Sequence, residues 1–237
     1  MVKVPSFLPR RYGSEVVRTQ SERLFEEYCA NGEVFCKRIS EEDSTTPDYE
    51  LKIHGQRIIV EVKEFSRNKA ERESDRLLSK RGYGTVLSNT PGNRVRKKIA
   101  DSSPQIKART QDIYPSILVL FDRGQVAGHL DPYHIRVAMY GLEQIHIAVP
   151  RDTAVTPYVT GISYGPKRKM TEEHNTSISS IGVLFTPGAS EIGLHVYHNK
   201  YATVPLDPAL LARHGIEQYE LEGEVPSNTA KWRGYRP

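Results

Sequence analysis

The chain has 237 residues and a formal net charge of +4. This length is ample for a hydrophobic core and suits one medium domain, or one domain with an appended module. The modest positive charge permits a polyanionic partner without requiring one. No apolar run is long enough to cross a bilayer, and the basic N-terminus lacks the apolar region of a signal peptide, so a cytoplasmic protein is expected.

The first predicted helix runs from Ser14 to Asn31 and follows an N-terminal arm formed by residues 1–13. Apolar residues recur on one stripe of this helix. Glu22 is the acidic residue nearest that stripe. Two interpretations of Glu22 stay open. In a helix that begins at Thr19, Thr19-x-x-Glu22 is a capping box; otherwise Glu22 is available to a site on the neighbouring strands.

Two cysteines, Cys29 and Cys36, occupy apolar positions and lack a C-x-x-C spacing. Buried free thiols are therefore expected, rather than a disulfide or a zinc site. A first strand is predicted from Glu33 to Ile39, and a polar connection follows it.

The stretch from Thr46 to Phe65 predicts a β-hairpin, because apolar and polar residues alternate on both sides of His54-Gly55. Glycine accepts positive φ freely and histidine does so more often than most residues, so this pair suits a two-residue turn. The turn fixes the register. The pairs that then face each other are Ile53 and Gln56, Leu51 and Ile58, Tyr49 and Val60, and Asp48 and Glu61.

This register places three charged side chains on one face. Side chains alternate along a strand, so Lys63 shares a face with Glu61, while the alternate residues from Ile58 to Val62 point the other way, into a core. Directly opposed residues such as Asp48 and Glu61 lie about 4.5–5.5 Å apart at Cβ, and like charges so placed destabilise a sheet. A bound divalent cation explains the arrangement. The simpler alternative is a turn-entry aspartate beside a solvated strand face with an incidental ion pair.

Pro47-Asp48, a gap and then Glu61-Val62-Lys63 resemble the signature of the PD-(D/E)xK nuclease superfamily. Restriction endonucleases, Holliday-junction resolvases and RecB-type nuclease domains belong to it. The motif is short, and the looser resemblance extends from Ser14 to Asp122. It implies a restriction-endonuclease-like α/β fold, with a mixed central β-sheet flanked by helices and, here, additional C-terminal strands. The implied nuclease-like core spans residues 14–125.

The resemblance also implies the site residues. Asp48, Glu61 and the Val62 carbonyl would hold Mg²⁺ or Mn²⁺, which prefer oxygen ligands, and a glutamate on the first helix, here Glu22, often joins the metal site. Asp48, Glu61 and Lys63 would be catalytic, with the lysine orienting or deprotonating the attacking water. The expected reaction is phosphodiester hydrolysis by metal-activated water, which leaves a 5′-phosphate and a 3′-hydroxyl.

The segment from Ser66 to Asn93 is long, charged and rich in Gly and Ser. A segment of this length is usually functional or disordered. One expectation is a lid over bound nucleic acid, with Arg76, Lys80 and Arg81 near phosphates. The other is a mobile surface insertion with a short helix from Arg72 to Leu78.

A basic helix is predicted from Arg94 to Gln111, with Pro104 as a break that could divide it into two helices. A basic helix beside a metal site suits a phosphate backbone, although a charge run is also often a solvated face. Gln105 falls where superfamily members often carry a polar residue near the active site. The candidate nucleic-acid-binding residues of this helix are Arg94, Arg96, Lys97, Lys98, Gln105 and Lys107.

Ser116 to Phe121 is a continuous apolar run, which predicts a buried central strand. Residues 126–220 are expected to extend the same domain with strands and short helices, and residues 221–237 to form a polar tail. The extension is predicted to contain a helix from Asp131 to Leu142, strands from Glu143 to Val149 and from Tyr158 to Arg168, a two-stranded meander from Ser177 to Tyr197, and a helix from Asp207 to His214.

Together these features favour a Mg²⁺-dependent nuclease in restriction, repair or defence. DNA is the expected partner, with RNA as the open alternative and no membrane partner. The chain is expected to act as a homodimer or as a subunit of a larger assembly. The alternative function is a catalytically silent module that binds nucleic acid or docks a partner on a nuclease-like fold.

Overall fold

The computed structural model describes residues 18–40, 46–82, 90–123, 130–187, 191–223 and 231–235. The predicted arm of residues 1–13 lies outside these ranges. Within them the chain forms five helices and ten strands. None of the helices in the described ranges is long and apolar enough to cross a membrane.

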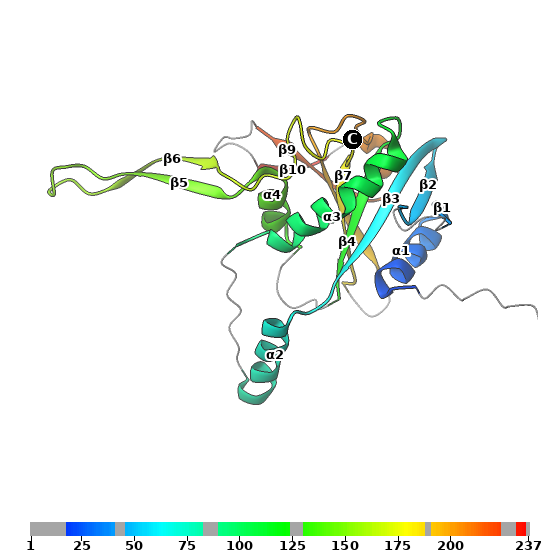
Figure 1. Ribbon diagram of the computed structural model, residues 1–237, viewed down its shortest axis with the longest axis horizontal. Helices are drawn as coiled ribbons and strands as arrows, with labels where there is room; N and C mark the ends of the chain where they lie inside the picture. Colours follow the sequence, from blue (N-terminus) through cyan, green and yellow to red (C-terminus); the bar gives the residue numbers. More distant parts are fainter. Residues whose placement is uncertain are drawn as a thin grey trace, which may run out of the picture.

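Eight strands form one mixed sheet (Figure 1). They are, in chain order, β1 (Phe35–Arg38), β2 (Tyr49–Ile53), β3 (Gln56–Phe65), β4 (Ser116–Asp122), β7 (Ser180–Phe185), β8 (Gly193–His198), β9 (Glu217–Glu222) and β10 (Lys231–Gly234). Across the sheet they follow the same order. β3, β4 and β7 run parallel in the centre, β8 and β9 also pair in parallel, and the other neighbours are antiparallel.

The hairpin of β2 and β3 has the register predicted from its turn. His54 and Gly55 both adopt positive φ, 48° and 84°, as a two-residue type I′ turn requires. The paired residues are Tyr49 and Val60, Leu51 and Ile58, and Ile53 and Gln56. β4 pairs with the other edge of β3, so β3 lies inside the sheet and its central residues are buried on both faces.

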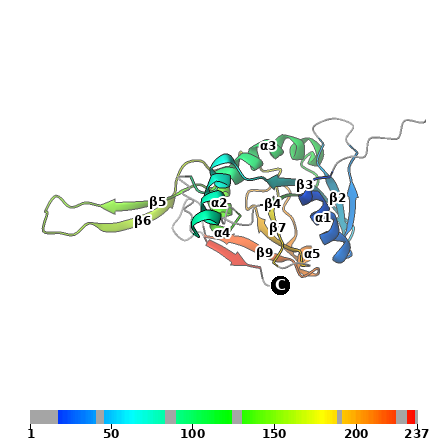
Figure 2. The same cartoon turned by 90° about the horizontal axis from the view of Figure 1, so that it is seen from below.

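Helices cover both faces of the sheet (Figures 1 and 2). α1 (Gln20–Asn31) and α5 (Pro208–Ala212) contribute buried residues to one face, and α3 (Asn93–Thr110) and α4 (Pro132–Tyr140) to the other. β4 supplies apolar side chains to both cores, which confirms the predicted buried central strand. Both cysteines are free thiols as expected, although only Cys29 is fully buried.

α3 is a single helix, which confirms the helix predicted from Arg94 to Gln111, and the division left open at Pro104 does not occur. Proline removes one helical hydrogen bond. Val95 and Ile99 before it and Ile106 after it are nevertheless fully buried in the same core. Packing of this apolar stripe against the sheet stabilises both halves of the helix in one direction.

α2 (Lys69–Arg81) occupies the first half of the segment interpreted as a lid or an insertion. It is longer than the expected helix from Arg72 to Leu78, and it begins with a capping box formed by Asn68 and Glu71. It projects from the end of β3 away from the sheet (Figures 1 and 2). Residues 83–89 lie outside the described ranges, so the lid stays a prediction.

The C-terminal strands enlarge the central sheet. β7 and β8 confirm the predicted meander. The polar tail predicted for residues 221–237 was wrong, because β9 reaches Glu222 and β10 forms the outermost strand. Trp232 packs on Tyr197 with ring centroids 5.0 Å apart and donates a 2.8 Å hydrogen bond to the Pro132 carbonyl. These contacts to residues distant in sequence hold β10 in place at the edge of the sheet.

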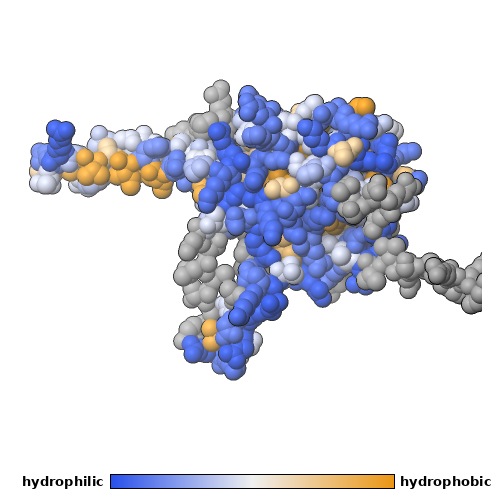
Figure 3. Space-filling view, viewed as in Figure 1, coloured by the Kyte–Doolittle hydropathy of each residue, from blue (hydrophilic) through white to orange (hydrophobic). Residues whose placement is uncertain are grey.

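The two remaining strands, β5 (Glu143–Ala148) and β6 (Tyr158–Tyr164), form a separate hairpin. It extends from the body as an arm (Figures 1 and 2). Figure 3 shows an apolar stripe along this arm. Seven of the eleven exposed large hydrophobic residues in the described ranges belong to it: Ile145, Ile147, Val149, Val155, Tyr158, Val159 and Ile162.

Candidate functional site

Asp48 directly precedes β2, and the register of the hairpin places it opposite Glu61. Its carbonyl accepts a 2.9 Å hydrogen bond from the Ile39 backbone N–H. Its Oδ2 atom accepts a 2.7 Å hydrogen bond from the Val62 backbone N–H. Main-chain groups of two different strands therefore fix both the backbone and the carboxylate of Asp48.

The Val62 carbonyl lies on the Asp48 side of β3. The N–H and the carbonyl of one strand residue point toward the same neighbouring strand, and the Val62 N–H is bonded to Asp48. Asp48, Glu61 and Val62 thus place three oxygen-bearing groups at the open end of the hairpin, away from its turn. All of them are placed by strand geometry, which is why the sequence pattern identified them.

Glu61 is a buried carboxylate, with 1% of its surface exposed. Its Oε1 atom contacts the Lys63 ammonium. Its Oε2 atom is buried and has no hydrogen bond of normal geometry within the described residues, although the Asp48 backbone N–H is near enough to lower the pKa of the carboxyl. Burial first, and then the negative charge of Asp48, raise the pKa of Glu61 to about 7. The carboxyl therefore titrates near neutral pH.

Asp48, Glu61, Lys63 and the Val62 carbonyl make up the candidate centre. Lys63 and Asp48 also have shifted pKa values. Burial lowers the pKa of Lys63, but the carboxylates of Glu61, Asp48 and Glu22 raise it by more, so its net direction is upward. Burial raises the pKa of Asp48, and the Val62 N–H and the Lys63 charge only partly oppose this. The lysine is thus held as a cation between acids that are costly to ionise together.

Glu22 caps α1, as one of the two interpretations predicted. Thr19 is the N-cap, so the helix begins at Gln20 rather than at Ser14. Glu22 Oε2 accepts hydrogen bonds from the Thr19 backbone N–H at 2.6 Å and from its hydroxyl at 2.8 Å. Glu22 Oε1 pairs with the Arg38 guanidinium at 2.9 Å. Capping does not exclude an electrostatic role, because the Glu22 charge also acts on Asp48 and Lys63.

Arg38 was missed by the sequence reasoning. It pairs with Tyr49 across β1 and β2 and binds Glu22, and its charge lowers the pKa of Asp48. A lone arginine in a short, half-exposed strand carries no motif. Only the pairing of β1 with β2 brings it beside the acids.

The centre contains two carboxylates rather than three. In the part of the chain that the structure describes, no group of three or more His, Cys, Asp or Glu side chains could hold a metal ion. Mg²⁺ commonly binds through one or two carboxylates and keeps several waters. The donor set here, two carboxylates and a main-chain carbonyl, fits such a cation.

Two of the predicted basic residues of α3 lie near the centre. Burial lowers the pKa of Lys98, and the charge of the neighbouring Lys63 lowers it further. Arg94 lies over the Phe65 ring with its guanidinium 4.9 Å from the ring centroid. It also pairs with Glu71 at 2.8 Å and donates to the Ser66 carbonyl at 2.6 Å. Arg94 therefore ties α2 to the end of β3 and α3.

Arg96 does not suit phosphate binding, which corrects the prediction for this residue. Only 3% of it is exposed. Its guanidinium donates to the carbonyls of Val137 at 3.0 Å and Pro91 at 2.6 Å. These bonds join α3 to α4, so Arg96 is structural. A charge pattern alone cannot separate such a buried arginine from its exposed neighbours.

The other predicted contacts are spread more widely. Gln105 lies two helical turns from Lys98 on the same side of α3, and its Oε1 atom is buried without a hydrogen bond within the described residues. Lys97 and Lys107 are exposed. Arg76, Lys80 and Arg81 lie on α2, where Arg76 pairs with Glu73 at 3.0 Å. The structure therefore places Lys98 beside Lys63, with Arg94 next to Lys98. Gln105 shares only the side of the helix with Lys98, and Arg76, Lys80 and Arg81 belong to the projecting α2.

A second set of cations lines a cavity of about 340 Å³ at the edge of β1. Its walls include Lys37, Arg38 and Arg109, with Thr46 two residues before Asp48. The cavity thus borders the chain segment that leads into the candidate centre. Glu50 is the one acid in this lining, against three cations.

Comparisons of the chain with protein-family models, with curated proteins and with solved structures found no match.

Proposed function

We propose that this chain is a metal-dependent nuclease of the PD-(D/E)xK type, with a restriction-endonuclease-like core. One observation carries the proposal. Asp48 and Glu61 oppose each other at the start of one hairpin, Lys63 is paired with Glu61, and the buried Glu61 Oε2 atom has no well-formed hydrogen bond within the described residues. An unsatisfied buried carboxylate oxygen destabilises a fold unless a ligand uses it.

The order of the elements supports the proposal. α1, β1, the β2–β3 hairpin, α3 and β4 follow one another as the resemblance implies, with α2 inserted before α3. β3 and β4 are parallel neighbours in the centre of a mixed sheet.

The residues present fit a hard divalent cation. Asp48, Glu61 and the Val62 carbonyl would hold Mg²⁺ or Mn²⁺, and Glu22 would act on the same site through its charge. Such a cation, when bound, polarises a phosphate and lowers the pKa of a coordinated water. Its charge would also satisfy the buried Glu61 and the half-buried Asp48, whose raised pKa values reflect desolvation without a sufficient counter-charge.

Lys63 supplies the positive charge that the protein itself contributes. Its raised pKa keeps it protonated at neutral pH, so it suits stabilisation of negative charge on a phosphate oxygen better than proton removal in this state. Lys98, next to it on α3, adds a second positive charge whose pKa is lowered by burial. Both groups favour a phosphodiester substrate, most simply DNA, with RNA as the alternative.

The test is a cleavage assay in Mg²⁺ and in Mn²⁺ on linear, circular, single-stranded and branched DNA, with single-stranded RNA alongside. Asp48→Asn keeps an oxygen that can accept the Val62 N–H, and Lys63→Met keeps the length of the side chain. Each change is expected to reduce cleavage by at least about 100-fold. Lys52→Met is the matched control, because Lys52 is exposed on β2 away from the centre, and it should cleave as the wild type does.

Cleavage that survives both Asp48→Asn and Lys63→Met would overturn the assignment of the site. Salt-sensitive DNA binding without turnover in either metal would favour the silent binding module instead. Lys52→Met shows whether removing a surface lysine alone changes cleavage, and urea unfolding of each variant shows whether a lost activity is a lost fold.

A further inference from the structure

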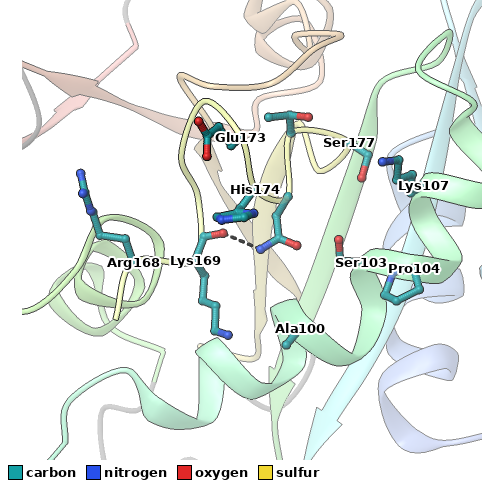
Figure 4. A pocket seen from close by; sticks show the side chains of 11 residues that line it. Ala100, Ser103, Pro104, Lys107, Arg168, Lys169, Glu173, His174 and Ser177 are labelled. Carbon is teal, nitrogen blue, oxygen red and sulfur yellow. Dashed lines mark hydrogen bonds between the residues drawn. The ribbon is translucent and has the colours of Figure 1, made fainter. Parts of the chain in front are cut away.

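A second polar pocket, of about 630 Å³, lies on the other side of α3 from the candidate centre. Figure 4 shows its two walls. Ser103, Pro104 and Lys107 come from the second half of α3, and Arg168 and Lys169 come from the segment before β7. The volume lies within the range of small-molecule sites, about 300–1,000 Å³.

The pocket carries an excess of positive charge. Lys107, Arg168 and Lys169 line it, together with His174, against the single carboxylate of Glu173. Lys107, Arg168 and Lys169 have no ion pair with any described residue. Cations gathered without counter-charges repel one another, so an anion bound between them would be stabilised.

Ser177 gives an independent indication of a ligand. It lines the same pocket, yet only 7% of it is exposed. Its hydroxyl makes no hydrogen bond within the described residues. A buried hydroxyl without a partner is uncommon, because its desolvation is then uncompensated. A ligand oxygen in the pocket would give it one.

The wall that carries these groups is held in place from several sides. The Met170 N–H donates to the Met139 carbonyl at 2.8 Å, and the Thr203 N–H donates to the Thr176 carbonyl at 2.8 Å. The Asn199 side chain donates to the Ile178 carbonyl at 2.8 Å. The Asn175 amide bonds the Lys169 carbonyl, as the dashed line in Figure 4 shows. The pocket is therefore largely formed before any ligand enters.

α3 separates this pocket from Asp48 and Glu61. Lys98 and Lys107 are nine residues apart, which at 100° per residue places them on opposite sides of the helix. Lys98 faces Lys63, as their electrostatic coupling indicates, whereas Lys107 faces the pocket. The pocket and the candidate centre are therefore distinct, and one phosphate cannot occupy both.

We propose that this pocket binds a phosphate-bearing ligand. Phosphate offers several acceptor oxygens and up to two negative charges, which match Arg168, Lys107 and Lys169 better than one carboxylate would. The Ser177 hydroxyl donates to one of those oxygens. The same chemistry has two sources: a free nucleotide, or a backbone phosphate of a nucleic acid that also reaches the other side of α3.

The experiment measures binding to the full chain by titration calorimetry, with three probes: inorganic pyrophosphate, ADP and a 20-base-pair DNA duplex. Asp48→Asn is the background for every measurement and no divalent metal is added, so the result does not depend on nuclease activity. Lys107→Gln and Arg168→Gln each remove one exposed cation from the pocket. Arg151→Gln is the matched control, since Arg151 is exposed in the loop that joins β5 to β6, outside the pocket.

We expect each pocket substitution to weaken binding at least tenfold and Arg151→Gln to leave it unchanged. Ser177→Ala should also weaken binding while leaving the thermal midpoint the same or slightly higher, because it removes an unsatisfied hydroxyl. Loss of pyrophosphate and ADP binding would assign a free phosphate ligand. Loss of duplex binding alone would support the same pocket and assign the nucleic-acid source. No binding of any probe, or binding that the pocket substitutions do not change, would overturn the proposal.

Discussion

The β2–β3 and β5–β6 hairpins have the same alternation of apolar and polar residues but differ in burial. β2–β3 lies between β1 and β4 under the covering helices, and Ile58 is 0% exposed. Within the described residues no further strand pairs with β5–β6, and Ile147 is 59% exposed. The buried hairpin carries the carboxylates, whereas the exposed arm carries an aliphatic stripe (Figure 3).

The contrast shows what alternation does and does not determine. In the arm, Ile145 pairs with Ile162 and Ile147 with Val159, on one face of the ribbon. The opposite face is polar, with a 2.7 Å contact between His146 and Ser163. The pattern separates the two faces of each hairpin. Whether a face is buried depends on neighbours that come from elsewhere in the chain.

The largest expected difference between the hairpins is in stability. Ile58→Ala should lower the free energy of unfolding by about 2–5 kcal/mol, because it leaves a cavity in the core. Ile147→Ala removes the same atoms from an exposed site and should change it by less than about 0.5 kcal/mol. Urea unfolding measures both. Equal losses would mean that the arm is buried in solution.

The second expected difference is in how stability depends on pH. Because the folded-state pKa of Glu61 is raised to about 7, folded protein keeps a proton that the unfolded chain has already lost between about pH 4.5 and 7. Stability should therefore fall as pH rises through this window, by up to about 1.4 kcal/mol per pH unit. Asp48 contributes in the same direction.

Urea unfolding at intervals from pH 5 to 8 tests this, with Glu61→Gln as the comparison. The substitution should flatten the pH profile of stability. Mg²⁺ should raise the unfolding midpoint of the wild type more at pH 8 than at pH 5.5, because it competes with the proton on the same carboxylates. A wild-type profile as flat as that of Glu61→Gln would contradict the burial of this acid.

Removing the Lys63 cation from the β2–β3 hairpin should lower the free energy of unfolding by an intermediate amount. Lys63→Met leaves the Glu61 carboxylate without its counter-charge. We expect a loss of about 2 kcal/mol at pH 8, below the ~3–5 kcal/mol of a fully buried pair because Lys63 is partly exposed, and a smaller loss at pH 5 where Glu61 is protonated. His146→Ala, which breaks the exposed contact in the arm, is the control and should cost under about 0.5 kcal/mol.

The smallest effect concerns how far the centre extends beyond its hairpin. Thr19→Ala should cost about 1 kcal/mol, because it removes the N-cap of α1. Glu22→Gln keeps a side chain suited to a capping box but removes the charge. It should cost about 1 kcal/mol, because one amide oxygen cannot serve both Thr19 and Arg38. It should also weaken Mg²⁺ binding, measured by calorimetry, by about tenfold, as outer residues of a metal site do. Complete loss of Mg²⁺ binding would make Glu22 a direct ligand.

Much of the candidate centre was predictable because it depends on local geometry. The turn at His54-Gly55 set the register, and side-chain alternation then placed Glu61 and Lys63 on one face. Arg38 was not predictable, since its contact with Glu22 depends on how β1 meets α1. The burial of Arg96 was likewise set by α4, which begins more than thirty residues later.

The sequence by itself determined the hairpin, its register and the charges on it, because turn conformation and strand periodicity involve neighbouring residues. The tertiary structure alone decided which surfaces became interior. It buried Glu61, turned the expected polar tail into an edge strand held by Trp232, and left β5–β6 as an arm. Burial follows from contacts between segments far apart in the chain, and those contacts set the pKa of Glu61 and the charge of the pocket behind α3.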